Sequence, residues 1–129
     1  MEYKGISYQE DQDLNLGILK LSENNIVSDF DFVLKVSIFV ELVGFKRYKY
    51  VLFKKRDQDF EISSRLYDFT QNLIVKTLFY YGVKGIYFLV NEERYKKYQS
   101  LPEKVYAFQN MEEIVEHIRF SCEKRSQLK

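Results

Sequence analysis

The alternation of apolar and polar residues predicts an αβ unit in the middle of the chain. One set of apolar positions recurs with the 3.6-residue period of a helix and forms a single stripe: Leu66, Phe69, Leu73, Ile74, Thr77 and Tyr81. Ser63 is placed to cap the start of this helix, and Gly82 is placed to end it in the left-handed conformation. The apolar and aromatic run Gly85–Val90 then predicts a buried strand. Because the segment 48–55 predicts a strand before the helix, the whole unit indicates a parallel βαβ crossover and an α/β sheet.

Residues 1–22 predict an N-terminal hairpin. Apolar residues alternate over 3–9 and again over 14–21, and the polar segment Gln9–Asp13 separates them. The alternation breaks at Gly17, which favours a β-bulge at that residue.

A second helix is predicted from Ser28 to about Val43. Ser28 and Asp31 have the spacing of a capping box. The segment 32–43 also alternates as a strand would, but its length and its cap favour a helix, with Gly44 as the stop.

The C-terminal third predicts a short helix, a strand and a final helix. The short helix spans Asn91–Ser100 and ends before Pro102, and the strand spans 104–108. Asn110 caps the final helix, and the tail 120–129 is expected to fray. The final helix presents one apolar stripe: Met111, Ile114, Val115 and Ile118.

The segment Asp59–Val90 resembles the STAS family, whose best-known members are SpoIIAA-like anti-sigma-factor antagonists. The resemblance rests on a strand, a charged turn, Phe-x-Ile-Ser, an amphipathic helix and Gly-Val-Lys-x-Ile-x-Phe, and it continues into Val105–Phe108 and Asn110–Ile114. It covers roughly Asp29 to Arg119. It implies one STAS-like domain over residues 1–129, with a mixed four- to five-stranded sheet and about four flanking helices. The function it implies is a non-enzymatic regulatory or protein-interaction module.

Regulatory STAS proteins carry a phosphorylatable serine in an Asp-Ser-Ser-Gly-like turn before this helix. Here the turn reads Asp59-Phe-Glu-Ile-Ser-Ser-Arg65, with no glycine and no aspartate directly before the serines, so it departs from that pattern. Ser63 and Ser64 remain the candidate phosphosites, because a helix N-terminus favours negative charge. The alternative is that Ser63 only caps the helix.

Composition narrows the function classes. The chain has 129 residues, a length that fits one domain, and 20 basic against 19 acidic residues give a net charge of +1. This balance supplies no general attraction to nucleic acid or to an anionic membrane. One cysteine, no apolar leader and no long apolar run predict a soluble cytoplasmic protein without a membrane segment.

The catalytic inventory is small. His117 is the only histidine, it does not share a helix face with Cys122, and it is interpreted as a lone surface or interface histidine. No phosphate-binding loop or nucleophile turn occurs, so the sequence predicts no catalytic residues, no metal and no cofactor.

Two alternative functions remain open at this stage. One is a small-ligand (nucleotide or lipid) binding protein or an enzyme, using the pocket at the C-terminal ends of the strands. The other is a nucleic-acid binder through the basic and aromatic run Lys46–Arg56, although alternation as a strand places its charges at the two strand ends.

The final hypothesis concerns a partner surface. On the helical wheel, Val75 and Phe79 lie opposite the predicted core stripe, and Asp68, Gln71 and Asn72 surround them. An apolar pair rimmed by polar residues indicates a contact with a protein partner or a homodimer. The alternative is that the N-terminal segment covers the pair.

Overall fold

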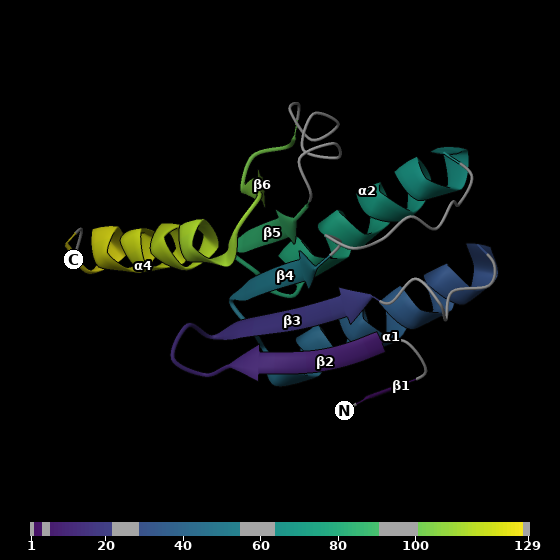
Figure 1. Cartoon of the computed structure of the whole chain (residues 1–129), viewed down its shortest axis with the longest axis horizontal. Coiled ribbons are helices and arrows are strands. Elements are labelled where there is room, and N and C mark those ends of the chain that lie inside the picture. Colours follow the sequence, from purple (N-terminus) through teal and green to yellow (C-terminus); the bar gives the residue numbers. More distant parts are fainter. Residues whose placement is uncertain (1, 4–5, 22–28, 55–63, 91–100, 128–129) are drawn as a thin grey trace.

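The computed structural model describes residues 2–3, 6–21, 29–54, 64–90 and 101–127 (Figure 1). Its elements are, in chain order, β1 (Glu2–Tyr3), β2 (Ile6–Asp11), β3 (Leu16–Leu21), α1 (Asp29–Lys46), β4 (Tyr50–Lys54), α2 (Ser64–Tyr80), β5 (Gly85–Leu89), β6 (Val105–Phe108) and α4 (Met111–Gln127). The predicted short helix Asn91–Ser100 lies outside the described residues.

All the described strands join one mixed sheet in which spatial order follows chain order, β1-β2-β3-β4-β5-β6. The five longer strands are β2 to β6, and the two-residue β1 extends the edge beside β2. β2 and β3 pair antiparallel, whereas β3, β4, β5 and β6 are parallel neighbours. The fold is therefore an α/β fold with a mixed five-stranded core sheet, as predicted, and the structure describes three of the roughly four helices that were expected.

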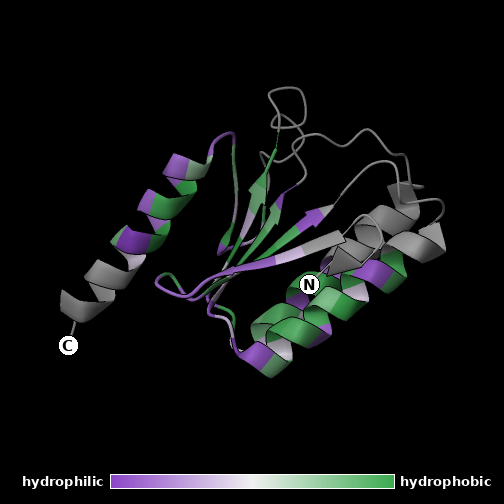
Figure 2. Cartoon of the chain, turned by 60° about the horizontal axis from the view of Figure 1, so that its bottom comes forward, coloured by the Kyte–Doolittle hydropathy of each residue, from purple (hydrophilic) through white to green (hydrophobic). Residues whose placement is uncertain are grey.

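The helices cover both faces of this sheet, as Figure 2 shows. α1 and α2 pack on one face, and their buried side chains share a core cluster with one set of strand residues: Tyr8, Leu19, Val51, Phe53, Ile86 and Phe88. α4 packs on the opposite face, where Ile114 and Ile118 are fully buried. The second cluster contains the alternate strand residues: Leu16, Ile18, Tyr50, Leu52, Tyr87 and Leu89. Side chains of successive strand residues point to opposite faces, so each helical layer has its own core.

The N-terminal hairpin is confirmed, but its turn lies later than predicted. The turn occupies residues 12–15, where Asn15 has a φ of 53° and the Asp11 carboxylate accepts a hydrogen bond from the Leu14 amide at 3.2 Å. The bulge predicted at Gly17 is wrong, because Gly17 pairs in regular register with Glu10. Gly17 instead lies against the Tyr48 ring, where a Cβ atom would meet Cε2 at 2.7 Å and Cγ at 3.0 Å.

Residues 32–43 form a helix, so the alternative of a central strand is excluded. The stop predicted at Gly44 is wrong, because α1 continues to Lys46 and ends where Arg47 adopts a φ of 58°. Gly44 has a packing role: a Cβ atom there would lie 3.0 Å from the Tyr81 ring, so the glycine permits close approach of that side chain.

Two other helix ends follow the predicted signals, the end of α2 and the start of α4. Gly82 has a φ of 96°, and its amide donates to the Phe79 carbonyl while the Val83 amide donates to the Leu78 carbonyl. This pair of bonds is a Schellman motif, so the predicted stop is confirmed. At α4, Oδ1 of Asn110 accepts a hydrogen bond from the Glu113 amide nitrogen at 2.9 Å, which confirms the predicted cap. The tail that was expected to fray from residue 120 is helical as far as Gln127.

Candidate functional site

The structure describes only some of the site residues that were predicted from the sequence. Ser63 lies outside the described residues, and so do the side chains of Ser64, Asp68 and Gln71. α2 begins at Ser64, one residue after the predicted cap. The phosphosite hypothesis therefore stays a prediction.

The orientation predicted for Val75 and Phe79 is wrong. Both side chains are half-buried and pack against the core cluster under α1 and α2, whereas Leu73, which was assigned to the core stripe, is 55% exposed. Asn72 is exposed as predicted. The buried face is centred on Ile74 and Leu78, so the helix is rotated by roughly one residue position, about 100°, from the predicted wheel.

Large apolar side chains are exposed on the outer side of the α1–α2 layer. On α1, Phe45 is 82% exposed and Leu34 is also exposed. On α2, Tyr80 is 87% exposed. It lies on the same face of the helix as Leu73, which precedes it by seven residues. Both helices cover the same face of the sheet, so these two stripes point away from it on the same side of the molecule. We call Leu34, Phe45, Leu73 and Tyr80 the outer layer surface.

A second group of chemically capable residues surrounds His117 on the opposite face. The Tyr87 hydroxyl is hydrogen-bonded to Nδ1 of His117 at 2.7 Å, although 30 residues separate them in the chain. The imidazole also contacts the Tyr106 ring, with centroids 4.3 Å apart, and the Phe108 ring at 5.6 Å. Burial lowers the pKa of His117 below its ordinary value of 6.5, which favours the neutral imidazole.

His117 was interpreted as a lone surface or interface histidine, and the part of this interpretation that left it without partners in the chain is therefore wrong. Its hydrogen-bond partner comes from β5, and two aromatic neighbours come from β6. The signal in the sequence was the alternation of Tyr106 and Phe108 along β6. Their side chains and that of Tyr87 on β5 lie on the same face of the sheet. That signal identifies the face but not the histidine that packs on it.

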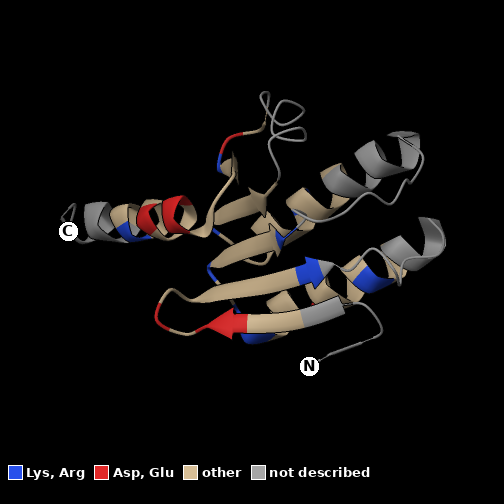
Figure 3. Ribbon diagram, viewed as in Figure 1, with Lys and Arg blue, Asp and Glu red and all other residues tan. Residues whose placement is uncertain are grey.

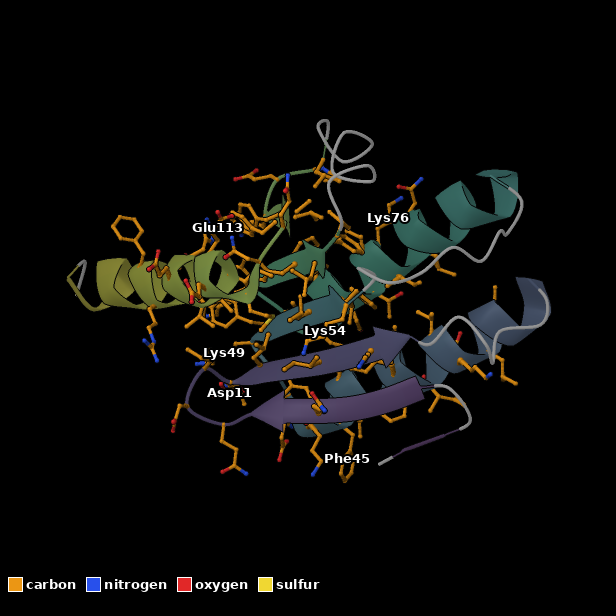
Figure 4. The ribbon with its side chains drawn as sticks, viewed as in Figure 1. Asp11, Phe45, Lys49, Lys54, Lys76 and Glu113 are labelled. Carbon is orange, nitrogen blue, oxygen red and sulfur yellow. The ribbon has the colours of Figure 1, made fainter. Side chains whose placement is uncertain are left out.

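An open groove of about 520 Å³ runs beside this histidine. Its lining comes from the end of β6 and from α4: Phe108, Glu113, Glu116, His117, Arg119 and Phe120. Glu113 lies in the first turn of α4, and Glu112, Glu113 and Glu116 all precede Arg119 along this helix (Figures 3 and 4). The groove thus combines aromatic rings, two carboxylates, one guanidinium and one imidazole.

A smaller cavity of about 250 Å³ lies near β2 and the end of α1. Tyr48 donates a hydrogen bond of 2.6 Å to the Glu10 carboxylate there, and Lys46 lines the same cavity. The hydrogen bond from Tyr48 lowers the pKa of Glu10, and burial raises the pKa of Tyr48. The lowered pKa keeps Glu10 ionised as the acceptor, and the raised pKa keeps Tyr48 protonated as the donor. The bond therefore indicates a structural link between β2 and the segment before β4.

The basic run Lys46–Arg56 is divided between elements. Lys46 ends α1, and Figure 4 shows Lys49 and Lys54 near opposite ends of β4. The predicted separation of its charges to the strand ends is confirmed for these described residues. In Figure 3 the Lys and Arg positions in the described part of the run are accordingly dispersed along the ribbon.

The pocket predicted at the carboxyl ends of the strands falls mainly on residues 55–63 and 91–100, which lie outside the described residues. Over the part of the chain that is described, no three His, Cys, Asp or Glu side chains are grouped so as to hold a metal ion. Within the same ranges, no helix has both the length and the apolar character needed to span a membrane.

In comparisons with known proteins, the chain matches no protein-family model, no curated protein and no solved structure. The chain is thus established as a small α/β domain with a mixed sheet, and no family is identified.

Proposed function

We propose that this protein is a non-enzymatic regulatory or protein-interaction module that resembles STAS-domain proteins. The observation that carries the proposal is the exposure of two large aromatic side chains, Phe45 and Tyr80, on neighbouring helices of one layer. Exposed single apolar residues are common on proteins, but a group on one face is typical of a contact surface.

The composition of the outer layer surface supports this proposal. Tyrosine and phenylalanine are enriched in protein interfaces, because a rigid ring gives a large contact area and loses few rotamers on binding. Glu41 and Lys76 are exposed on the same two helices and supply charges of both signs near the aromatic residues. An apolar centre with a charged rim is the usual arrangement of such interfaces.

The order of elements adds a second support. Over the range of the resemblance, a helix, a strand, the helix and strand of the central αβ unit, a last strand and a final helix follow one another in the order that the resemblance implies. Ser64 begins α2, the same helix that carries Leu73 and Tyr80. A phosphate at Ser63 or Ser64 would therefore lie at one end of the helix that presents the proposed interface.

The test is a double substitution, Phe45→Ser with Tyr80→Ser, in the full chain. Because both side chains are more than four-fifths exposed, the fold should lose little stability, within about 0.5 kcal/mol for each change. The matched control is Phe120→Ser, which removes an exposed phenylalanine on the opposite side of the sheet.

Two measurements decide the outcome. Light scattering reports self-association, and quantitative capture from the native cell extract reports partners. The proposal predicts that the double variant loses the dimer or the captured protein while Phe120→Ser retains it. Equal behaviour of the wild type and the double variant in both assays, with the fold intact, would overturn the proposal.

A further inference from the structure

The groove beside α4 has the size of a small-molecule site. Its volume of about 520 Å³ falls within the roughly 300–1,000 Å³ usual for such sites. Phe120, which lines it, is 65% exposed, so most of this ring is not used in the core. A ring of this kind beside polar groups is available for a ligand, and its burial by a ligand would be favourable.

The imidazole of His117 is held in a fixed orientation at the groove. Nδ1 is hydrogen-bonded to Tyr87, whose side chain is 1% exposed, and Tyr106 packs against the ring. Nε2 has no partner among the described residues and is the ring nitrogen left for a ligand. Because burial lowers the pKa of His117, this nitrogen belongs to a neutral ring near pH 7.

The charges and rings of the groove select the ligand class. Glu113 and Glu116 contribute two negative charges, and Arg119 contributes one positive charge, so the lining carries a net charge of about −1 and favours a cation. Phe108 and Phe120 offer ring faces to a planar group and to a nearby ammonium.

We propose that this groove binds a small planar aromatic amine. The aromatic ring of the ligand packs on Phe108 and Phe120, and its ammonium group lies near Glu113 and Glu116. A polar N–H or ring nitrogen of the ligand bonds to Nε2 of His117. This site is separate from the outer layer surface, because α4 packs on the other face of the sheet.

The chain has no tryptophan, so an indole probe gives the only indole fluorescence in a binding assay. Tryptamine is the cationic probe, and indole-3-acetate is its anionic counterpart with the same ring. We expect saturable binding of tryptamine and binding of indole-3-acetate weaker by about tenfold or more, because the lining repels an anion. Phe120→Ala should weaken tryptamine binding by about tenfold through loss of one aromatic contact.

The charge arm uses Glu113→Gln combined with Glu116→Gln, which keeps the shape of the lining. This variant should bind tryptamine at least about threefold more weakly and should reduce the preference over indole-3-acetate. Phe45→Ala, an exposed phenylalanine on the α1–α2 side, is the matched control and should leave binding unchanged.

The single histidine supplies an independent readout, since the imidazole signals in an NMR spectrum all belong to His117. Tryptamine should shift these signals with the same saturation as the fluorescence. Binding without a His117 shift, equal affinity for the two probes, full affinity in Phe120→Ala or no saturable binding would each overturn the proposal. None of these outcomes bears on the outer layer surface, so the two proposals fail separately.

Discussion

Tyr87→Phe should measure the link between α4 and the sheet. The substitution removes one hydroxyl and leaves the ring in place, so the aromatic contacts of Tyr87 with Tyr106 and Phe108 are kept. The lost bond to His117 Nδ1 is 2.7 Å long, and a neutral hydrogen bond contributes about 0.5–1.5 kcal/mol net. His117 is half-buried and can bind water in the variant, so we expect a loss of about 1 kcal/mol of unfolding free energy. For a chain of this length, that loss lowers Tm by about 4 °C.

The assay is urea unfolding followed by circular dichroism, carried out as a double-mutant cycle with His117→Ala. Tyr87→Phe alone removes every interaction of the hydroxyl. The double-mutant cycle isolates the interaction energy between this hydroxyl and the His117 imidazole. A coupling energy of about 1 kcal/mol is expected. Coupling below about 0.3 kcal/mol, within the usual error of additivity, would refute the claim that this bond fastens α4 to β5.

Two further predictions concern pH and packing. The pKa of His117 is lower in the folded chain than in the unfolded chain, so the unfolded chain binds the proton first as the pH falls. The contribution of His117 to the unfolding free energy should therefore be greatest above pH 6.5. It should decline as the pH drops from 6.5 to the lower pKa of the folded state. His117→Gln should flatten this decline in unfolding curves measured between about pH 5 and 8, and an unchanged decline would assign it to other groups. Gly17→Ala should cost about 1–3 kcal/mol, because the new methyl group meets the Tyr48 ring. In a Tyr48→Ala background the same change should cost less than about 0.5 kcal/mol, and an equal cost in both backgrounds would show that the ring is not the obstacle.

Local signals predicted the elements well, because each depends on a few adjacent residues. Gly82 ends α2 with a positive φ, and Asn110 caps α4, as the residue types indicate. Gly44 shows the limit of such signals. A glycine is used either for a left-handed backbone or for close approach of another group, and only the position of Tyr81 reveals that Gly44 serves the second use.

The candidate surfaces were harder to predict, because they depend on how elements pack. α2 has apolar residues on most of its circumference, so periodicity permits more than one core stripe. Packing on the sheet selects Ile74 and Leu78 and leaves Leu73 exposed, which the sequence pattern does not specify. His117 likewise gains its role from Tyr87, a residue on a strand 30 positions away. The site chemistry therefore appears only when β5 and α4 are placed side by side.

Consecutive residues of β5 anchor the two helical layers, and this limits which substitutions can test function. Tyr87 faces α4 and bonds to His117, whereas Phe88 faces the other side and stacks on Phe53, which in turn contacts Phe39 of α1. All of these side chains except His117 are buried, so a large change in any of them disturbs a core cluster and with it the whole sheet. Loss of binding in such a variant would not distinguish a missing contact from a weakened fold. Exposed residues such as Tyr80 and Phe120 lack this ambiguity, because their side chains can be shortened on one face while the sheet and the opposite face stay intact.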